Sequence, residues 1–90
     1  MGKYIVEIKP IAEKQIKLHL KSGNKKIINK IAKILLELSE NPFEGEGKPE
    51  ELKHDLSGFW SRRLNLEHRL VYQIDKENVY VCVVTALGHY

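Results

Sequence analysis

Four side chains in the second half of the sequence carry groups that can cleave a phosphodiester. Glu50 supplies a carboxylate, and Lys53, Arg63 and Arg69 supply cations that recur along residues 45–70. Such a cleavage needs a base for the attacking hydroxyl, an acid for the leaving oxygen, and fixed positive charge around the phosphorus. The segment therefore predicts a site for a phosphate-containing substrate that works without a metal ion.

The last two residues of the sequence, His89 and Tyr90, add an imidazole and an aromatic ring. Because they lie far along the chain from residues 45–70, a site that used them would be assembled from separated parts. Two simpler explanations compete with this one. A histidine at a chain end is usually solvated, and Glu50 beside Lys53 also fits an ion-pair network without a catalytic role.

Other chemistries find few suitable residues. No His, Cys and Asp residues have the spacing of a metal site, and no Ser-His-Asp arrangement is apparent. Cys82 lies in the apolar run 79–84, where we expect a small core side chain. A single cysteine cannot form an internal disulfide, which fits a reducing cytoplasm. We therefore expect no metal, no cofactor and a cytoplasmic protein.

The composition is typical of one globular domain. The sequence has 90 residues, of which 42% are hydrophobic and 30% charged, and we expect residues 1–90 to form a single domain. No apolar run is long enough for a membrane span, and the first residues lack a signal-peptide core. The net charge is +3. Lysines that punctuate the first third of the chain form either a solvated helix face or a surface that faces phosphates: Lys9, Lys14, Lys17, Lys21, Lys25, Lys26, Lys30 and Lys33.

Periodicity predicts a strand followed by two helices. Residues 3–9 alternate between apolar and polar side chains, as in a half-buried strand. A first helix is predicted over residues 10–21, from Pro10 up to the turn at Gly23. Asn24 is expected to cap a second helix, whose apolar side chains recur at three- and four-residue spacing. These are Ile27, Ile28, Ile31, Ile34, Leu35 and Leu38.

The second half of the chain predicts a loop and three strands. Residues 41–49 contain two prolines and two glycines, which favour a loop. Strand-like runs follow at residues 59–64, 68–74 and 79–85, and their short connections indicate an antiparallel meander. The order β-α-α-β-β-β predicts an α+β fold, with two N-terminal helices packed on a small, mainly antiparallel sheet.

A hairpin between the first two of these strands would bring two arginines together. If residues 65–67 form a three-residue loop, Arg63 lies opposite Arg69, and Arg62 points to the other face of the sheet. Two guanidinium groups in such positions repel each other and destabilise the sheet. An anion between them would offset this repulsion, whether a substrate phosphate, Glu50 or Glu67.

Four stretches of the second half resemble one protein family. They read NPFEGEGKPE at 41–50, LKH at 52–54, LSGFWSRR at 56–63 and EHRLVY at 67–72. This segment is similar to the Txe/YoeB branch of the RelE toxins, which are ribosome-dependent mRNA interferases of bacterial toxin–antitoxin pairs. The similarity is dense from 41 to 72 and looser in the predicted helices, and it implies the RelE-like fold.

The resemblance gives each candidate residue a role. It implies that Glu50 is the general base that deprotonates the ribose 2′-hydroxyl, and that His89 is the general acid that protonates the leaving 5′ oxygen. The products would be a 2′,3′-cyclic phosphate and a 5′-hydroxyl. The other candidates are cations that stabilise the phosphorane (Lys53, Arg63 and Arg69), substrate-binding residues (Tyr90 and Lys48) and a supporting carboxylate (Glu67).

The resemblance also implies partners. These are mRNA in the ribosomal A site, ribosomal RNA, a cognate antitoxin protein whose tail covers the site, and a second copy of the chain in a homodimer. The tail TALGHY at 85–90 departs from relatives, which usually carry a basic or aromatic residue before the His-Tyr pair. Two other classes stay open: a topoisomerase-inhibiting toxin of the same fold, and a non-catalytic module that binds ribosome or antitoxin.

Overall fold

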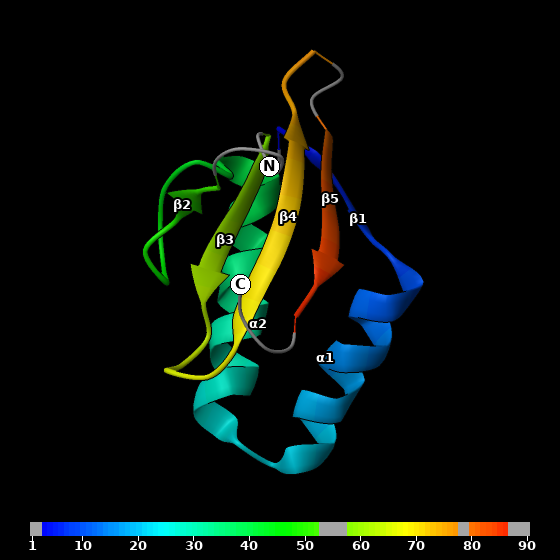
Figure 1. The fold of residues 1–90 in the computed structure, drawn as a ribbon, viewed down its shortest axis with the longest axis vertical. Coiled ribbons are helices and arrows are strands. Elements are labelled where there is room, and N and C mark those ends of the chain that lie inside the picture. The colour runs from blue at the N-terminus through cyan, green and yellow to red at the C-terminus, as the bar shows by residue number, and fades with distance from the viewer. Residues whose placement is uncertain (1–2, 53–57, 78–79, 87–90) are drawn as a thin grey trace.

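The fold is two helices packed on a mixed five-stranded sheet, in a computed structural model that describes residues 3–52, 58–77 and 80–86. The sheet has the order β1-β5-β4-β3-β2, and β3, β4 and β5 form the predicted antiparallel meander. β1 lies parallel to β5 at one edge (Figure 1). The predicted α+β fold is confirmed. Its elements are β1 (Ile5–Ile8), α1 (Pro10–Ser22), α2 (Lys25–Glu40), β2 (Glu50–Glu51), β3 (Phe59–Arg63), β4 (Arg69–Asp75) and β5 (Tyr80–Thr85).

Local signals set the ends of the helices as the sequence predicted. Gly23 follows α1 with a φ of 75°, a left-handed conformation that glycine adopts without steric cost. The side chain of Asn24 then caps α2 by accepting a hydrogen bond of 3.2 Å from the amide of Ile27. In Figure 1, α2 runs behind the sheet, and α1 lies beside the lower end of β5. Neither helix of the described chain is long and apolar enough to cross a membrane.

The hydrophobic core lies between α2 and one face of the sheet. Most of the predicted stripe is buried, with Ile34 and Leu38 fully inaccessible to solvent. These side chains pack against the buried residues Leu70 and Tyr72 of β4 and their neighbours on β5. Each fully buried aliphatic side chain stabilises the fold by roughly 1.5–3 kcal/mol. The opposite face of the sheet therefore does not take part in this core.

One strand was not predicted. β2 has two residues, and it pairs with the edge of β3 so that Glu50 lies opposite Ser61 and Glu51 lies opposite Trp60. The sequence offers no strand signal here, because two residues after a loop rich in proline and glycine show no alternation. The pairing places Glu50 on the face of the sheet that points away from the core.

Candidate active site

Glu50, Ser61 and Arg69 come from three neighbouring strands and meet on one face of the sheet. Nη1 of Arg69 lies 3.3 Å from Oε1 of Glu50 and donates a second hydrogen bond, also of 3.3 Å, to Oγ of Ser61. Cross-strand pairing explains the meeting, because Glu50 is opposite Ser61, and Ser61 is opposite Val71, two residues along β4 from Arg69. Side chains two residues apart on a strand share a face. The predicted pairing of a carboxylate with a cation is present for Glu50 and Arg69.

The predicted register of the hairpin is confirmed. Arg63 lies directly opposite Arg69, and the amide of Leu64 donates a hydrogen bond of 2.9 Å to the carbonyl of His68 at the closing pair. Glu50 is the carboxylate beside Arg69, whereas no described acidic side chain pairs with Arg63, which is exposed. One arginine of the pair is thus neutralised, and the other is open to an anion from outside.

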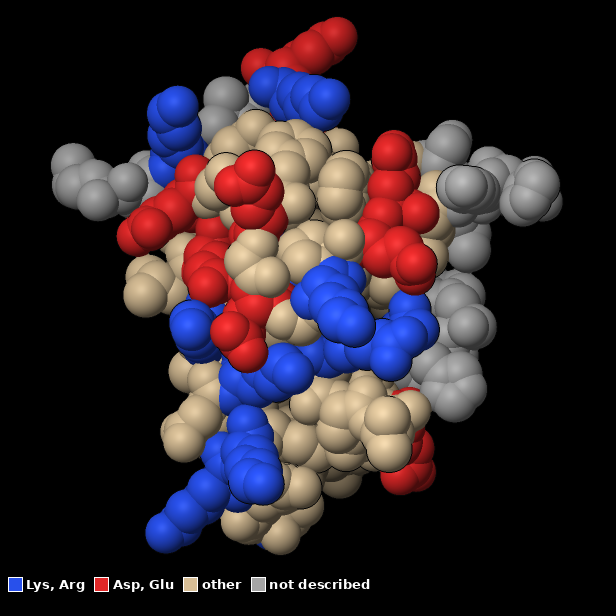
Figure 2. All heavy atoms as spheres, turned by 90° about the vertical axis from the view of Figure 1, so that its left-hand side faces the viewer, with Lys and Arg blue, Asp and Glu red and all other residues tan. Residues whose placement is uncertain are grey.

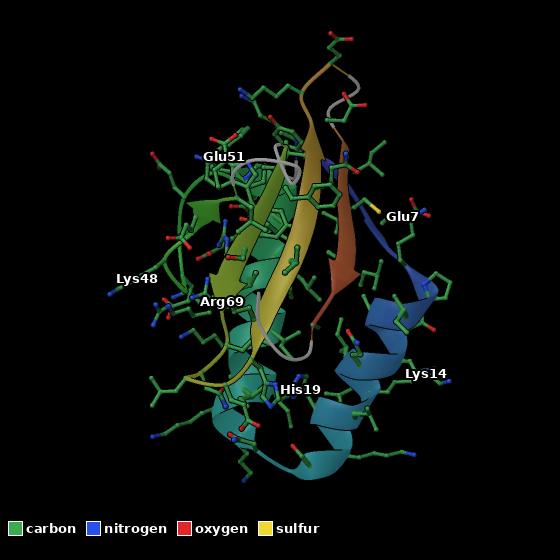
Figure 3. All side chains as sticks on the ribbon, viewed as in Figure 1. Glu7, Lys14, His19, Lys48, Glu51 and Arg69 are labelled. Carbon is green, nitrogen blue, oxygen red and sulfur yellow. The ribbon has the colours of Figure 1, made fainter. Side chains whose placement is uncertain are left out.

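Burial differs sharply between the two partners of the ion pair. The side chain of Arg69 is only 22% exposed, while that of Glu50 is 66% exposed. Arg69 is therefore held in place by the surrounding protein, and Figure 3 shows it at the lower end of β4, near β2. Glu50 reaches it from the solvent side. A substrate that approaches this face would meet the carboxylate first, with positive charge fixed behind it.

A backbone hydrogen bond at Gly47 joins the loop before β2 to β3. The carbonyl of Gly47 accepts a hydrogen bond of 2.7 Å from the amide of Arg63. The φ of Gly47 is 83°, and a Cβ there would lie 2.7 Å from the carbonyl oxygen of Arg63. Only glycine fits so close an approach of two backbones. Gly45 also has a positive φ, of 129°, so both glycines of the predicted loop adopt backbone conformations that favour glycine.

The candidates Lys48 and Glu67, and the nearby Glu46, do not contact this pair. Lys48 is exposed and points outward from the loop (Figure 3). Glu67 lies in the hairpin loop, with Oε1 3.9 Å from Nε2 of His68. Glu46 pairs with Lys33 of α2 at 3.3 Å. Of the described carboxylates in the loop and β2, Glu50 is the one that contacts Arg69.

Lys53, His89 and Tyr90 lie outside the described residues, so their predicted roles stay predictions. The structure does describe Ala86, the residue just before the segment that carries His89. Its amide donates a hydrogen bond of 2.8 Å to the side chain of Gln15, and its carbonyl oxygen lies 2.6 Å from Nε2 of His19. Both partners come from α1, and His19 is buried. Helix α1 therefore fixes the backbone at Ala86.

The sequence predicted correctly which face of the sheet Arg62 points to, but it indicated no role for this residue. It points to the core side of β3, opposite Leu70, and it is completely buried. The guanidinium donates to the hydroxyl of Tyr72 at 3.0 Å and to Oε1 of Glu37 at 2.6 Å. Burial raises the pKa of the Tyr72 hydroxyl, although Arg62 opposes this shift. The sequence did contain a signal that Arg62 has a structural role, because a charged side chain was expected at a strand position that faces the core.

The side of the molecule that carries β2 has a band of positive charge. Figure 2 shows Lys and Arg side chains across the middle of this side and at its lower left, with Asp and Glu side chains above the band, further Lys or Arg side chains near the top, and an acidic group at the lower right. No group of three or more metal-ligating side chains was found among the described residues. The arrangement suits recognition of an anionic substrate along the basic part.

Comparison with known proteins identifies the family. A profile of the YoeB-like toxins of bacterial type II toxin–antitoxin systems matches residues 15–90. The chain belongs to this family. The YoeB toxin of Escherichia coli strain K12 is 47% identical to this YoeB-like toxin over 64 residues, which cover 71% of this chain and 76% of the E. coli protein. The resemblance noted in the sequence is confirmed.

Solved structures agree with this assignment. A YoeB dimer from Staphylococcus aureus matches with a TM-score of 0.80 and 36% identity, covering 99% of this chain and 100% of that one. A YoeB–YefM complex from the same organism matches with a TM-score of 0.77 and 37% identity over 99% of this chain and 100% of that one. This YoeB-like toxin thus has the fold of a toxin that has been observed both as a dimer and bound to an antitoxin.

Proposed function

We propose that this YoeB-like toxin is a ribosome-dependent endoribonuclease that cleaves mRNA in the ribosomal A site and so inhibits translation. The observation that carries the proposal is the Arg69 guanidinium, which joins the buried Ser61 to the largely exposed Glu50 on the face of the sheet opposite the core. Arg63 stands directly opposite. A carboxylate held against fixed positive charge supplies a base and electrostatic stabilisation in one place, as phosphodiester cleavage without a metal requires.

In the proposed reaction, Glu50 takes the proton of the ribose 2′-hydroxyl as its oxygen attacks the adjacent phosphorus. Arg69 and Arg63, with Lys53 as a third cation, stabilise the negative charge on the phosphorane. His89 gives a proton to the 5′ oxygen as the bond from phosphorus to that oxygen breaks. The products are a 2′,3′-cyclic phosphate and a 5′-hydroxyl. Tyr90 and Lys48 bind the substrate beside this centre.

The burial of the described residues supports this division of roles. Arg69 is largely buried and bonded to Ser61, so its charge is positioned before substrate arrives and needs little reorganisation. Glu50 is largely exposed, and a single oxygen, Oε1, contacts Arg69. The other carboxylate oxygen is then free of described partners and can accept a proton. Arg63, without a described acidic partner, suits a phosphate oxygen.

Two macromolecular contacts belong to the same proposal. Ribosomal RNA would meet the lysines of α1 and α2, which are mostly exposed. A cognate antitoxin would cover the face that carries Glu50 and Arg69, as an antitoxin binds the S. aureus toxin. A homodimer is proposed on the same ground. The reducing cytoplasm, where ribosomes work, is the proposed location.

The test is primer extension on mRNA in purified ribosome complexes to which the toxin is added. Cleavage should appear in the A-site codon, and only when ribosomes are present. It should persist when cobalt hexammine replaces Mg²⁺, because that ion keeps its ligands and cannot offer a metal-bound water. Toxin that binds the complexes but leaves the mRNA intact would refute the nuclease and favour a non-catalytic binding module.

A further inference from the structure

The side chain of Arg62 lies on the opposite face of β3 from the candidate site, yet it is bonded to the loop that leads into that site. Arg62 is 0% exposed, and its neighbours in sequence, Ser61 and Arg63, point to the site face. Burying a guanidinium is costly unless its donors find partners. The partners that Arg62 has therefore indicate what this charge is for.

Most of these partners belong to loop 41–49. Nη2 donates to the carbonyl of Glu44 at 2.8 Å and, at 3.4 Å, to that of Asn41. Nη1 donates to the carbonyl of Glu46 at 3.4 Å and to Oε1 of Glu37 at 2.6 Å. Three backbone carbonyls of one loop thus share a single guanidinium, which replaces the hydrogen bonds that regular structure would supply.

The remaining partners of Arg62 bind the same loop. Oε1 of Glu37, which accepts from Arg62, also accepts a hydrogen bond of 2.9 Å from the amide of Glu46. The hydroxyl of Tyr72, which accepts from Arg62, donates 2.9 Å to the carbonyl of Pro42. The loop is therefore held at both its entry and its middle from the core side of the sheet.

Glu50 depends on where this loop ends. β2 has only two residues, which is too short to hold itself against β3 without support. Its approach is fixed by the bond between the carbonyl of Gly47 and the amide of Arg63, directly after the carbonyls that Arg62 binds. The contact of 3.3 Å between Glu50 and Arg69 is the last link in this chain of contacts.

We propose that Arg62 is a positioning residue for cleavage: it holds loop 41–49 from the core side of β3 so that Glu50 stands against Arg69, and it does not touch the RNA. The adjacent arginines of this sequence then have separate tasks, since Arg63 faces the substrate and Arg62 faces the loop. The inference rests on the proposed nuclease function for its kinetic consequence, but its structural consequence is independent of that function.

The test variant is Arg62→Lys, which keeps the charge but loses the fork of donors that binds several carbonyls at once. Single-turnover cleavage at saturating ribosome complex should fall about 10- to 100-fold, the scale of a displaced catalytic group. The concentration of complex that gives half the maximal rate should stay within about twofold, because ribosome contacts are untouched. In a Glu50→Gln background, Arg62→Lys should add less than about a further twofold, because Arg62 acts through Glu50.

Hydrogen exchange gives the structural readout. The amide of Arg63, which is bonded to Gly47, should exchange faster in Arg62→Lys, while amides of α2 keep their protection. Glu37→Gln is the second test variant, for use if Arg62→Lys does not fold, because it removes the charge of the carboxylate that pairs with Arg62. It should likewise speed exchange at the amide of Arg63 and slow cleavage. A core variant on the same helix, Ile34→Val, controls for stability and should leave the rate of folded protein unchanged.

Each outcome decides one point. Equal loss from Arg62→Lys in the wild-type and Glu50→Gln backgrounds would overturn the positioning role, as would wild-type rate with wild-type exchange at Arg63. A wild-type protein that never cleaves would refute the proposed function alone. Faster exchange at Arg63 in the variant would then still support Arg62 as the anchor of the loop.

Discussion

Replacing Glu50 by glutamine tests the proposed chemistry with little change in shape. Glutamine keeps an oxygen that can accept the hydrogen bond from Nη1 of Arg69, now 3.3 Å from the carboxylate. It removes the negative charge and the ability to take a proton at neutral pH. If Glu50 is the general base, cleavage should fail while the fold survives.

The two expected effects differ greatly in size. Loss of a general base slows a reaction by about 10²- to 10⁴-fold, which corresponds to roughly 3–5 kcal/mol on the barrier. The ion pair, by contrast, includes a carboxylate that is 66% exposed. Solvent-exposed pairs contribute about 0–1 kcal/mol to stability, so the melting temperature should fall by no more than about 4–8 °C.

The assay is single-turnover cleavage of ribosome-bound mRNA, with thermal unfolding measured on the same samples. Glu51→Gln is a matched control, because Glu51 is the next residue of β2 but lies opposite Trp60, on the other face. Figure 3 shows Glu51 well above Arg69. Glu51→Gln should cut at the normal rate. Normal cutting by Glu50→Gln, or an equal loss in Glu51→Gln, would show that the base is another residue.

Other predictions test Arg69, His89 and the buried titratable groups Cys82 and Tyr72. Arg69→Ala should slow cleavage by about 10²-fold or more with ribosome binding retained, and a normal rate would remove Arg69 from the mechanism. His89→Gln should abolish cleavage and leave the melting temperature unchanged, because an amide cannot deliver a proton; efficient cutting by this variant would exclude His89 as the acid. Burial raises the pKa of both the Cys82 thiol and the Tyr72 hydroxyl, so the unfolded chain ionises first as the pH rises, and the free energy of unfolding should decrease above about pH 8.5. Urea titrations at several pH values measure it, and a constant value up to pH 10 would contradict the burial of these groups.

The sequence by itself determined the local features of this protein. The apolar stripe of α2, the cap at Asn24 and the turn at Gly23 follow from the periodicity and conformational preferences of a few adjacent residues. The hairpin belongs to the same group. Once residues 65–67 are taken as a three-residue loop, the two-residue period of a strand places Arg63 opposite Arg69, and the structure has this register.

Only the tertiary structure decided which carboxylate meets Arg69. Residues 44–51 contain four glutamates, and local preference does not distinguish them. The choice of Glu50 depends on the pairing of β2 with β3, and the path of the loop depends on the buried guanidinium of Arg62 and its contact with Glu37 of α2. These hydrogen bonds join residues far apart in the sequence, so they exist only once the helix, the loop and the sheet have packed together.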